Sequence, residues 1–128
     1  MTPTTVAQRV LEALAATDTP EPPEDLFAGG CVTWHSFDEV EAPTVPDTFA
    51  TLRTIRAVVG DFTMSEVRAT GDGEGTGVAR YVLTGTLPDG ARLRAPAAMV
   101  IHVADGRAVR LEEYVDTAQL APLFAALG

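Results

Sequence analysis

The sequence predicts an α+β protein in which helices cover one face of a curved antiparallel sheet. Two helical patterns occupy much of the first half of the chain, and four segments with period-two alternation fill most of the second half. Glycine-containing turns separate these segments, which is typical of strands joined in chain order. The chain has 128 residues and is 46% hydrophobic, so it fits a single domain, residues 1–128, with a buried core.

The first predicted helix covers residues 4–16, where valine and leucine recur at helical spacing behind two threonines that can cap the helix. A connector of proline and acidic residues follows at 17–25. Residues 26–28 are expected to form one helical turn that two glycines end. Residues 31–37 then have the β-branched and aromatic composition of a strand.

An acidic loop at 38–46 precedes the second predicted helix, which begins at a cap on Asp47 and ends at Gly60. A last helix is predicted to begin near Pro122, because proline is disfavoured inside a helix and favoured in its first turn. The strands predicted between these two helices cover roughly residues 62–70, 77–87, 91–104 and 107–116.

The composition excludes several classes of function. The net charge is −9, which disfavours binding to nucleic acid, and nine arginines with no lysine exclude Schiff-base chemistry. Cys31 is alone and is expected to be a small buried hydrophobe, and two separate histidines make no metal site. We expect no cofactor and no membrane association. The arginine-, alanine- and glycine-rich composition is typical of GC-rich bacterial genomes, and the lack of a signal-peptide pattern predicts a cytoplasmic protein.

The most informative segment is the final predicted hairpin, whose Asp105-Gly106 turn connects two apolar runs. In its second strand, alternation places Glu113 on the same face as Leu111 and Val115. A carboxylate on an apolar face must be paired, neutralised or used, because burying an unpaired charge is costly. Glu113 is therefore the first candidate for a functional residue.

This order of elements, with Val32-Thr-Trp-His-Ser36 on the first strand and Asp105-Gly-Arg-Ala-Val-Arg-Leu-Glu-Glu-Tyr-Val-Asp116 in the last hairpin, resembles the nuclear transport factor 2-like superfamily. Within it, the chain is most similar to SnoaL-like polyketide cyclases and limonene-epoxide hydrolases. The resemblance covers nearly the whole chain. It implies a cone-shaped α+β barrel, in which the sheet wraps around N-terminal helices and encloses a central pocket.

The resemblance also implies roles for individual residues. Glu113 falls where these enzymes carry an aspartate that acts as general acid or base, and Arg80 falls where the epoxide hydrolases carry an arginine between two aspartates. The second of those aspartates would be at Val82, so the hydrolase triad is incomplete. Trp34 and Ser36 match the pair that positions water in the hydrolases, although only the serine hydroxyl can both donate and accept.

From these positions the sequence predicts a pocket in which Glu113, Arg80 and Ser36 are catalytic. His35 and Tyr81 are then expected on the opposite, outward faces of their strands, and an apolar outer face with Tyr81, Leu83 and Val100 predicts a homodimer. The predicted substrate-binding residues are the remaining side chains of matching strand parity, namely Trp34, Val82, Ala97, Met99, Ile101 and Leu111.

The predicted function is that of a cofactor-independent enzyme of isomerase, cyclase or hydrolase type, in which Glu113 moves a proton on a hydrophobic, oxygenated small molecule. Two alternatives remain open. The first is a non-catalytic module of the same fold that binds a small molecule or a partner, and the second is an epoxide hydrolase with an incomplete triad.

Overall fold

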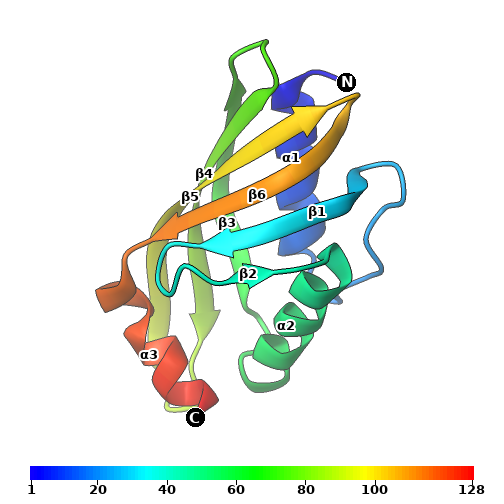
Figure 1. Cartoon of the computed structure of the whole chain (residues 1–128). Coiled ribbons are helices and arrows are strands. Elements are labelled where there is room, and N and C mark those ends of the chain that lie inside the picture. The colour runs from blue at the N-terminus through cyan, green and yellow to red at the C-terminus, as the bar shows by residue number, and fades with distance from the viewer.

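A six-stranded sheet, strongly bent and open along one side, forms the body of the computed structural model, which describes all of residues 1–128 (Figure 1). The strand order is β2-β1-β6-β5-β4-β3. Neighbouring strands are antiparallel except for β1 and β6, which run parallel. The strands are β1 (Phe27–His35), β2 (Glu41–Ala42), β3 (Thr63–Gly71), β4 (Thr76–Thr86), β5 (Arg92–Ala104) and β6 (Arg107–Val115).

The predicted α+β class and curved sheet are confirmed, but the expected all-antiparallel pairing is wrong at one position. Hairpins fix the directions of β3 to β6, because each of these strands follows its neighbour through a short turn. β1 is separated from β6 by a helix and four strands, so no turn sets its direction. It adds to the sheet edge in parallel, with Thr33 opposite Leu111 and His35 opposite Glu113.

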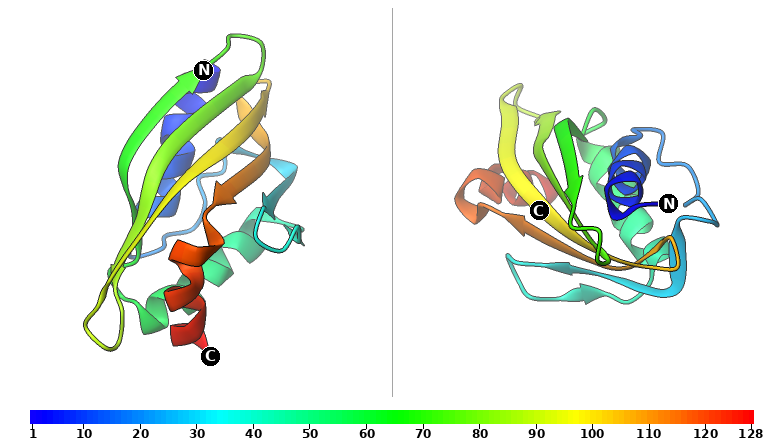
Figure 2. Two further views of the ribbon diagram at one scale, coloured as in Figure 1. Left: turned by 90° about the vertical axis from the view of Figure 1, so that its left-hand side faces the viewer. Right: turned by 90° about the horizontal axis from the view of Figure 1, so that it is seen from above.

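Local backbone chemistry shapes the sheet. The turn between β5 and β6 has positive φ at both central residues, 52° at Asp105 and 73° at Gly106, as a two-residue hairpin turn requires. In β3 the register shifts between Ser65 and Arg68, and Glu66 has a φ of 56°. Such a bulge adds twist and bends a strand. β3, which contains it, lies beside α1 (Figure 2).

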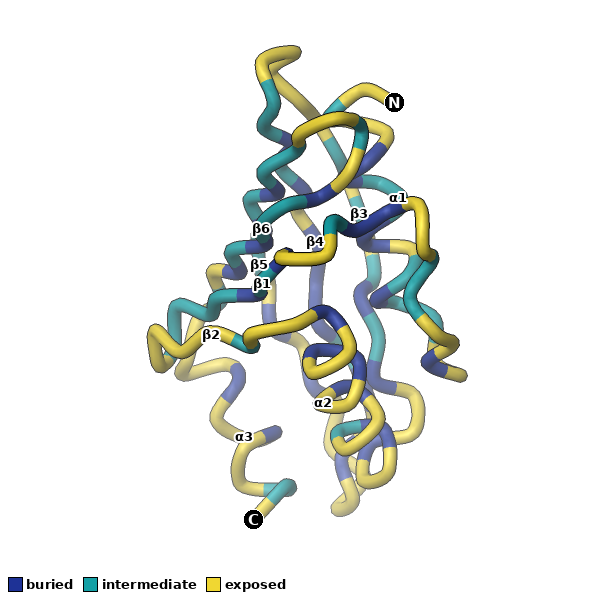
Figure 3. The backbone as a smooth tube through the Cα atoms, turned by 45° about the vertical axis from the view of Figure 1, so that its right-hand side comes forward, coloured by how far each residue is buried: buried dark blue, intermediate teal, exposed yellow.

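Three helices complete the fold: α1 (Pro3–Ala15), α2 (Val45–Val58) and α3 (Thr117–Leu127). Helix α1 lies in the hollow of the sheet, against β3 and β4, as seen from above in Figure 2. Gly77 allows this close contact, because a Cβ there would lie 2.7 Å from the carbonyl oxygen of Pro3. Helices α2 and α3 are mostly exposed and bury only their inner faces (Figure 3). None of the three helices has the length and hydropathy needed to cross a membrane.

The structure corrects three of the predicted element boundaries. Residues 26–28 do not form a helical turn, because the Leu26 carbonyl accepts a hydrogen bond from Ala108 and β1 begins at Phe27. Helix α2 begins before Asp47, with Thr44 as its cap and proline in its first turn, where a missing N–H costs nothing.

Helix α3 begins at Thr117 and contains Pro122, which the sequence had placed at a helix start. Asp116 caps the helix by accepting from the Ala118 N–H at 2.9 Å. The proline is exposed and removes one hydrogen bond, whereas Leu120 and Leu123 are buried by continuing the helix. Burial of these leucines therefore outweighs the local preference of proline.

A buried arginine on α2 joins this helix to the end of α1 and to the segment before β3. Arg56 is only 9% exposed, and its guanidinium donates to the Phe62 carbonyl at 2.9 Å, to the Thr19 hydroxyl at 3.0 Å and to the Leu14 carbonyl at 2.7 Å. The Leu14 carbonyl belongs to the last turn of α1, where carbonyls lack helical partners. Arg56 thus links α2, the end of α1 and the segment before β3.

Candidate active site

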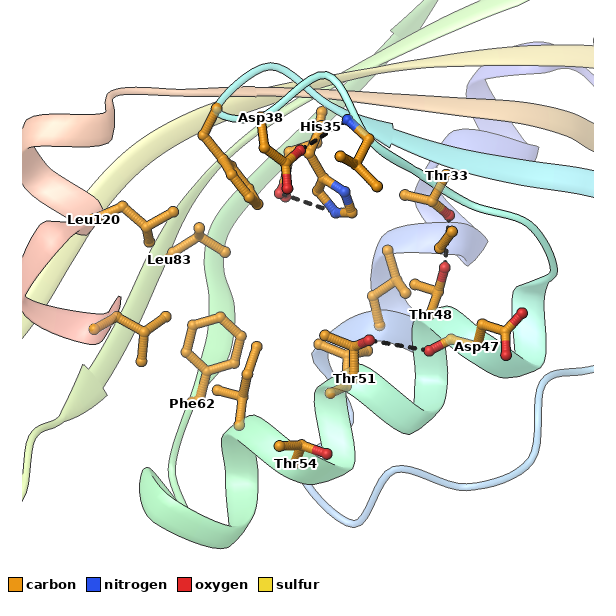
Figure 4. A pocket seen from close by; sticks show the side chains of 18 of the residues that line it. Thr33, His35, Asp38, Asp47, Thr48, Thr51, Thr54, Phe62, Leu83 and Leu120 are labelled. Atoms are coloured by element: carbon orange, nitrogen blue, oxygen red, sulfur yellow. Dashed lines mark hydrogen bonds and ion pairs between the residues drawn. The ribbon is translucent and has the colours of Figure 1, made fainter. Parts of the chain in front are cut away.

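A cavity of about 520 Å³ lies between the inner face of the sheet and the helices α2 and α3 (Figure 4). This volume is in the usual range for small-molecule sites. Most of its wall is apolar and includes Leu52, Phe62, Leu83, Met99, Leu120 and Phe124. A cavity of this kind favours a hydrophobic ligand, and its few polar side chains decide how that ligand is oriented.

The polar centre of the wall is Glu113, on β6, which is 8% exposed. The phenol of Tyr81 donates a hydrogen bond to Glu113 Oε2. The other oxygen, Oε1, lies 3.9 Å from Nε2 of His35. This distance permits electrostatic attraction but is too long for a direct hydrogen bond, so Oε1 keeps hydrogen-bonding capacity for a ligand.

The environment keeps Tyr81 a proton donor. Burial, together with the adjacent charge of Glu113 and the hydrogen bond between them, raises the pKa of Tyr81 well above its usual range. The phenol therefore stays protonated at neutral pH and holds one carboxylate oxygen in place. A carboxylate with one oxygen fixed and the other directed to a cavity has the geometry of a general acid or base.

Four strands position this group through their register. His35 on β1 lies opposite Glu113 on β6, and Glu113 lies opposite Met99 on β5. Tyr81 on β4 lies opposite Ala97, two residues before Met99, and reaches Glu113 diagonally across β5. The inner-face alternation of four strands therefore brings His35, Glu113 and Tyr81 together from distant parts of the chain.

Arg80 does not join this group. It is exposed and lies on the outer face of β4, because its neighbours Tyr81 and Ala79 are the residues that point inward. Arg80 was predicted to share a pocket with Glu113, and the structure does not bring the two residues together. Val82 shares the outer face of the strand with Arg80, and it does not line the cavity.

Trp34 and Ser36 also lie outside the cavity. Trp34 packs on the outer face against Tyr114, with ring centroids 5.3 Å apart. The Ser36 hydroxyl accepts a hydrogen bond from the Val115 N–H at 3.2 Å, which ties the end of β1 to β6. Ser36 and Ala97 line a shallow surface depression instead. The water-positioning pair implied by the resemblance is thus not assembled here.

The other predicted pocket residues lie on the inner face, as their parity requires. Met99 lines the cavity beside Glu113. Ile101 and Leu111 are fully buried in the core, further along the same two strands, and do not reach the cavity. Cys31 is also fully buried, as expected, and burial raises the pKa of its thiol to about 11.

Sequence reasoning missed His35 and Tyr81, both of which were expected to point outward. For β1 the available signal was the alternation of Cys31, Thr33 and His35, since a lone cysteine usually points into a core. For β4 the signal was Arg80, because a charged side chain usually lies on the exposed face of a strand. In both strands the assignment from the resemblance selected the opposite face.

The rim of the cavity is acidic. Asp38, Glu41 and Asp47 line it and are exposed, while no arginine lines it. Arg110 donates to Glu41 from the outer side of the sheet. No group of three or more His, Cys, Asp or Glu side chains has an arrangement suited to a metal ion.

The sequence matches no protein-family model, and no curated protein is recognisably similar to it in sequence. Solved structures match over nearly the whole chain. IdmH of Streptomyces antibioticus, assigned as a polyketide cyclase, is 18% identical, with a TM-score of 0.78 over 96% of this chain and 98% of IdmH. A SnoaL-like protein of Jannaschia sp., also assigned as a polyketide cyclase, is 15% identical, with a TM-score of 0.69 over 98% of this chain and 93% of its own.

An LEH-like epoxide hydrolase of M. tuberculosis is 20% identical, with a TM-score of 0.69 over 97% of this chain and 90% of the hydrolase. The structure therefore shares its α+β arrangement, a curved sheet packed against helices, with all three of these proteins. It has the nuclear transport factor 2-like fold, in the form shared by SnoaL-like polyketide cyclases and limonene-epoxide hydrolase-like proteins, which confirms the predicted fold.

Proposed function

We propose that the protein is a cofactor-independent enzyme that transfers a proton on a neutral, hydrophobic, oxygenated small molecule, with Glu113 as the general acid or base. One observation carries the proposal. In the wall of an apolar cavity of about 520 Å³, one oxygen of Glu113 is held by Tyr81, and the other faces the cavity beside His35.

The proposed first step is enolisation of a ketone. Glu113 Oε1 takes a proton from the carbon next to the carbonyl, the C–H electron pair becomes the C=C bond of an enolate, and negative charge moves to the carbonyl oxygen. A His35 N–H at the cavity wall is placed to donate to that oxygen, and such a donor stabilises developing charge best in a dry site.

The enolate can then follow two routes. In an isomerisation, protonated Glu113 returns the proton to a different carbon. In an aldol-type cyclisation, the enolate carbon attacks a second carbonyl of the same molecule, and the resulting alkoxide takes the proton from Glu113. The fold shared with proteins assigned as polyketide cyclases supports the second route.

Epoxide opening is the alternative reaction, and the fold shared with an LEH-like epoxide hydrolase supports it. Glu113 could donate a proton to an epoxide oxygen, but the hydrolase arrangement also needs an arginine and a water-positioning pair in the cavity. Arg80 and Ser36 both lie outside it. We therefore place enolate chemistry first and leave both residues out of the proposed mechanism.

The test is exchange of α-hydrogens in deuterated water, followed by NMR on 1-tetralone, a neutral bicyclic ketone. The wild type should accelerate exchange, and Glu113→Gln should lower the acceleration roughly 100-fold or more, which is the usual range for losing a general base. Glu112→Gln is the matched control, because Glu112 is adjacent in sequence but lies on the outer face. Its activity should equal that of the wild type.

A wild type that binds 1-tetralone without accelerating exchange would contradict the proposal and favour a non-catalytic binding module. Equal activity in Glu113→Gln would remove Glu113 from the mechanism. Labelled oxygen from water in a diol product, formed from a bicyclic epoxide, would instead support the hydrolase.

We also propose that the protein is a homodimer through the outer face of the sheet. Tyr81 and Leu83, which were predicted on the outer face, are buried on the inner face and cannot contribute to such an interface. The outer face nevertheless presents Tyr114, 46% exposed, packed on Trp34. Sedimentation equilibrium should give twice the chain mass for the wild type and a lower mass for Tyr114→Asp.

A further inference from the structure

A pair of buried hydroxyls lies in the cavity wall on the side formed by β1 and α2. Thr33 is 2% exposed and Thr48 is 8% exposed, and both line the cavity. The Thr48 hydroxyl donates to Thr33 Oγ1 at 2.8 Å. Figure 4 shows the two side chains facing each other at one side of the cavity, away from the apolar wall of Phe62 and Leu83.

The hydrogen-bonding capacity of this pair is not exhausted by the protein. A threonine hydroxyl donates one hydrogen bond and accepts up to two. The proton of Thr48 is used on Thr33, and none of the side-chain hydrogen bonds of the structure is donated by the Thr33 hydroxyl. Burying two hydroxyls where valines would fit costs stability unless their capacity is used. A ligand in the cavity can supply the acceptor.

The position of the pair relative to Glu113 sets the spacing of a ligand's polar groups. Thr33 and His35 are two residues apart on the inner face of β1, which separates them by about 7 Å along the strand. His35 lies opposite Glu113, and Thr33 lies opposite the fully buried Leu111. The cavity wall therefore has two buried polar points, one at Glu113 and His35 and one at Thr33 and Thr48. Thr51 and Thr54 also line the cavity, but they are exposed and donate to carbonyls of their own helix.

The charges around the cavity exclude anionic groups. Glu113 is in its wall, and the exposed carboxylates of Asp38 and Asp47 also line the cavity, whereas that of Glu41 is paired with Arg110. The net charge of the chain is −9, so the long-range field also repels anions. A second polar group of the ligand must then be a neutral acceptor, such as a carbonyl, ether or hydroxyl oxygen.

We infer that the Thr33–Thr48 pair binds an oxygen acceptor of the substrate, about 7 Å along β1 from His35, which faces the reacting group at Glu113. The substrate is accordingly a neutral, hydrophobic molecule with two oxygen functions at that separation, one ketone at the reacting end and one acceptor at the threonines. This inference rests on the proposed function, because it takes Glu113 as the reacting end.

Two ketone probes of nearly equal shape test the inference. 6-Methoxy-1-tetralone carries an ether oxygen across the ring system from its ketone, and 6-ethyl-1-tetralone has a methylene group in place of that oxygen. The wild type should bind the methoxy probe roughly five- to tenfold more tightly, which is the usual contribution of one net hydrogen bond. Dissociation constants are measured by calorimetric titration.

The variants identify the donor. Thr33→Val should abolish the preference for the methoxy probe while leaving the affinity for the ethyl probe unchanged, and Thr33→Ser should keep the preference. Glu113→Gln should keep the preference and lose α-hydrogen exchange. Should Thr33→Val fail to fold, as judged by circular dichroism, the comparison of the two probes on the wild type and Thr33→Ser still decides.

The outcomes separate this inference from the proposed function. Equal affinities of the wild type for the two probes, or a preference that survives in Thr33→Val, would overturn the inference and leave the proton-transfer proposal standing. A preference that depends on Thr33 in a protein with no exchange activity would support the site and contradict the proposed function. No binding of either probe at millimolar concentration would overturn both.

Discussion

Arg56→Met is the perturbation whose effect follows most directly from the structure. Methionine retains much of the aliphatic length of arginine and removes only the guanidinium. That group makes three hydrogen bonds, to the carbonyls of Leu14 and Phe62 and to the hydroxyl of Thr19, at 2.7–3.0 Å. Leu14 and Phe62 both line the cavity, so the arginine also fixes part of its wall.

The three hydrogen bonds of Arg56 determine how much stability the substitution removes. Hydrogen bonds from a charged donor contribute about 1.5–3 kcal/mol each, and a buried acceptor left unpaired costs about 1–3 kcal/mol. Part of this is offset because the unfolded arginine is fully hydrated, and burial lowers the pKa of Arg56. The free energy of unfolding should therefore fall by about 3 kcal/mol in Arg56→Met. For a chain of this size, that corresponds to a fall in Tm of roughly 10 °C.

The assay is thermal unfolding by calorimetry, with circular dichroism at room temperature to verify the fold. Arg53→Met is the control on the same helix, because Arg53 is exposed and bonds only the Thr19 carbonyl at 3.2 Å and Glu21 at 3.4 Å. Its Tm should change by no more than roughly 3 °C, as is usual for exposed ion pairs. Equal Tm shifts in the two variants would refute the view that Arg56 joins α2 to the end of α1 and to the segment before β3.

Gly77→Ala should have a Tm well below that of Gly29→Ala, because a Cβ at Gly77 would lie 2.7 Å from the start of α1, whereas a Cβ at Gly29 would have no atom within 4 Å. Equal melting temperatures would contradict the close approach of α1 to β4. Cys31, with its raised pKa of about 11, should not react with a disulfide reagent at pH 8 until guanidinium unfolds the chain, and rapid labelling of the native protein would argue against its burial. The pKa of Glu112 is lowered mainly by its hydrogen bond to His102, so the stability that this carboxylate contributes is present above pH 4.5 and is lost as pH falls below it. The difference in Tm between the wild type and Glu112→Gln should therefore close between pH 7 and pH 3. A difference that stays constant would be inconsistent with that hydrogen bond.

The last hairpin could be predicted from sequence because its determinants are local. An Asp-Gly pair favours positive φ at two successive residues, and the structure has positive φ at both Asp105 and Gly106. Once that turn is fixed, alternation alone places Leu111 and Glu113 on one face. The position of Glu113 in the cavity wall therefore follows from a few neighbouring residues.

The face of β4 could not be predicted in the same way, because both of its faces are apolar. Ala79 and Leu83 form one set, and Val78 and Val82 form the other. The choice is made by α1, whose first turn approaches the backbone of Gly77 too closely for any Cβ. That contact joins residues far apart in the chain, so no local pattern reports it.

β1 raised the same difficulty for a different reason. Thr33 and His35 alternate with Val32 and Trp34, and neither set is clearly polar. Which set points inward depends on the parallel register with β6, where His35 lies opposite Glu113. Parallel pairing is not set by a turn, and so the sequence alone leaves the composition of the site undecided.

Two adjacent glutamates on β6 differ in their surroundings, one being suited to a structural role and the other to a functional one. Glu112 points outward, where it bonds His102 at 2.7 Å and Arg110 at 3.1 Å, and its pKa is lowered by these partners. Glu113 points inward, where His35 is 3.9 Å away, no arginine approaches and a cavity remains in front of the carboxylate. Both residues are carboxylates beside a histidine, so residue type does not distinguish them. A carboxylate whose charge is balanced and whose oxygens are occupied can only stabilise the fold, whereas Glu113 keeps one oxygen available to a substrate.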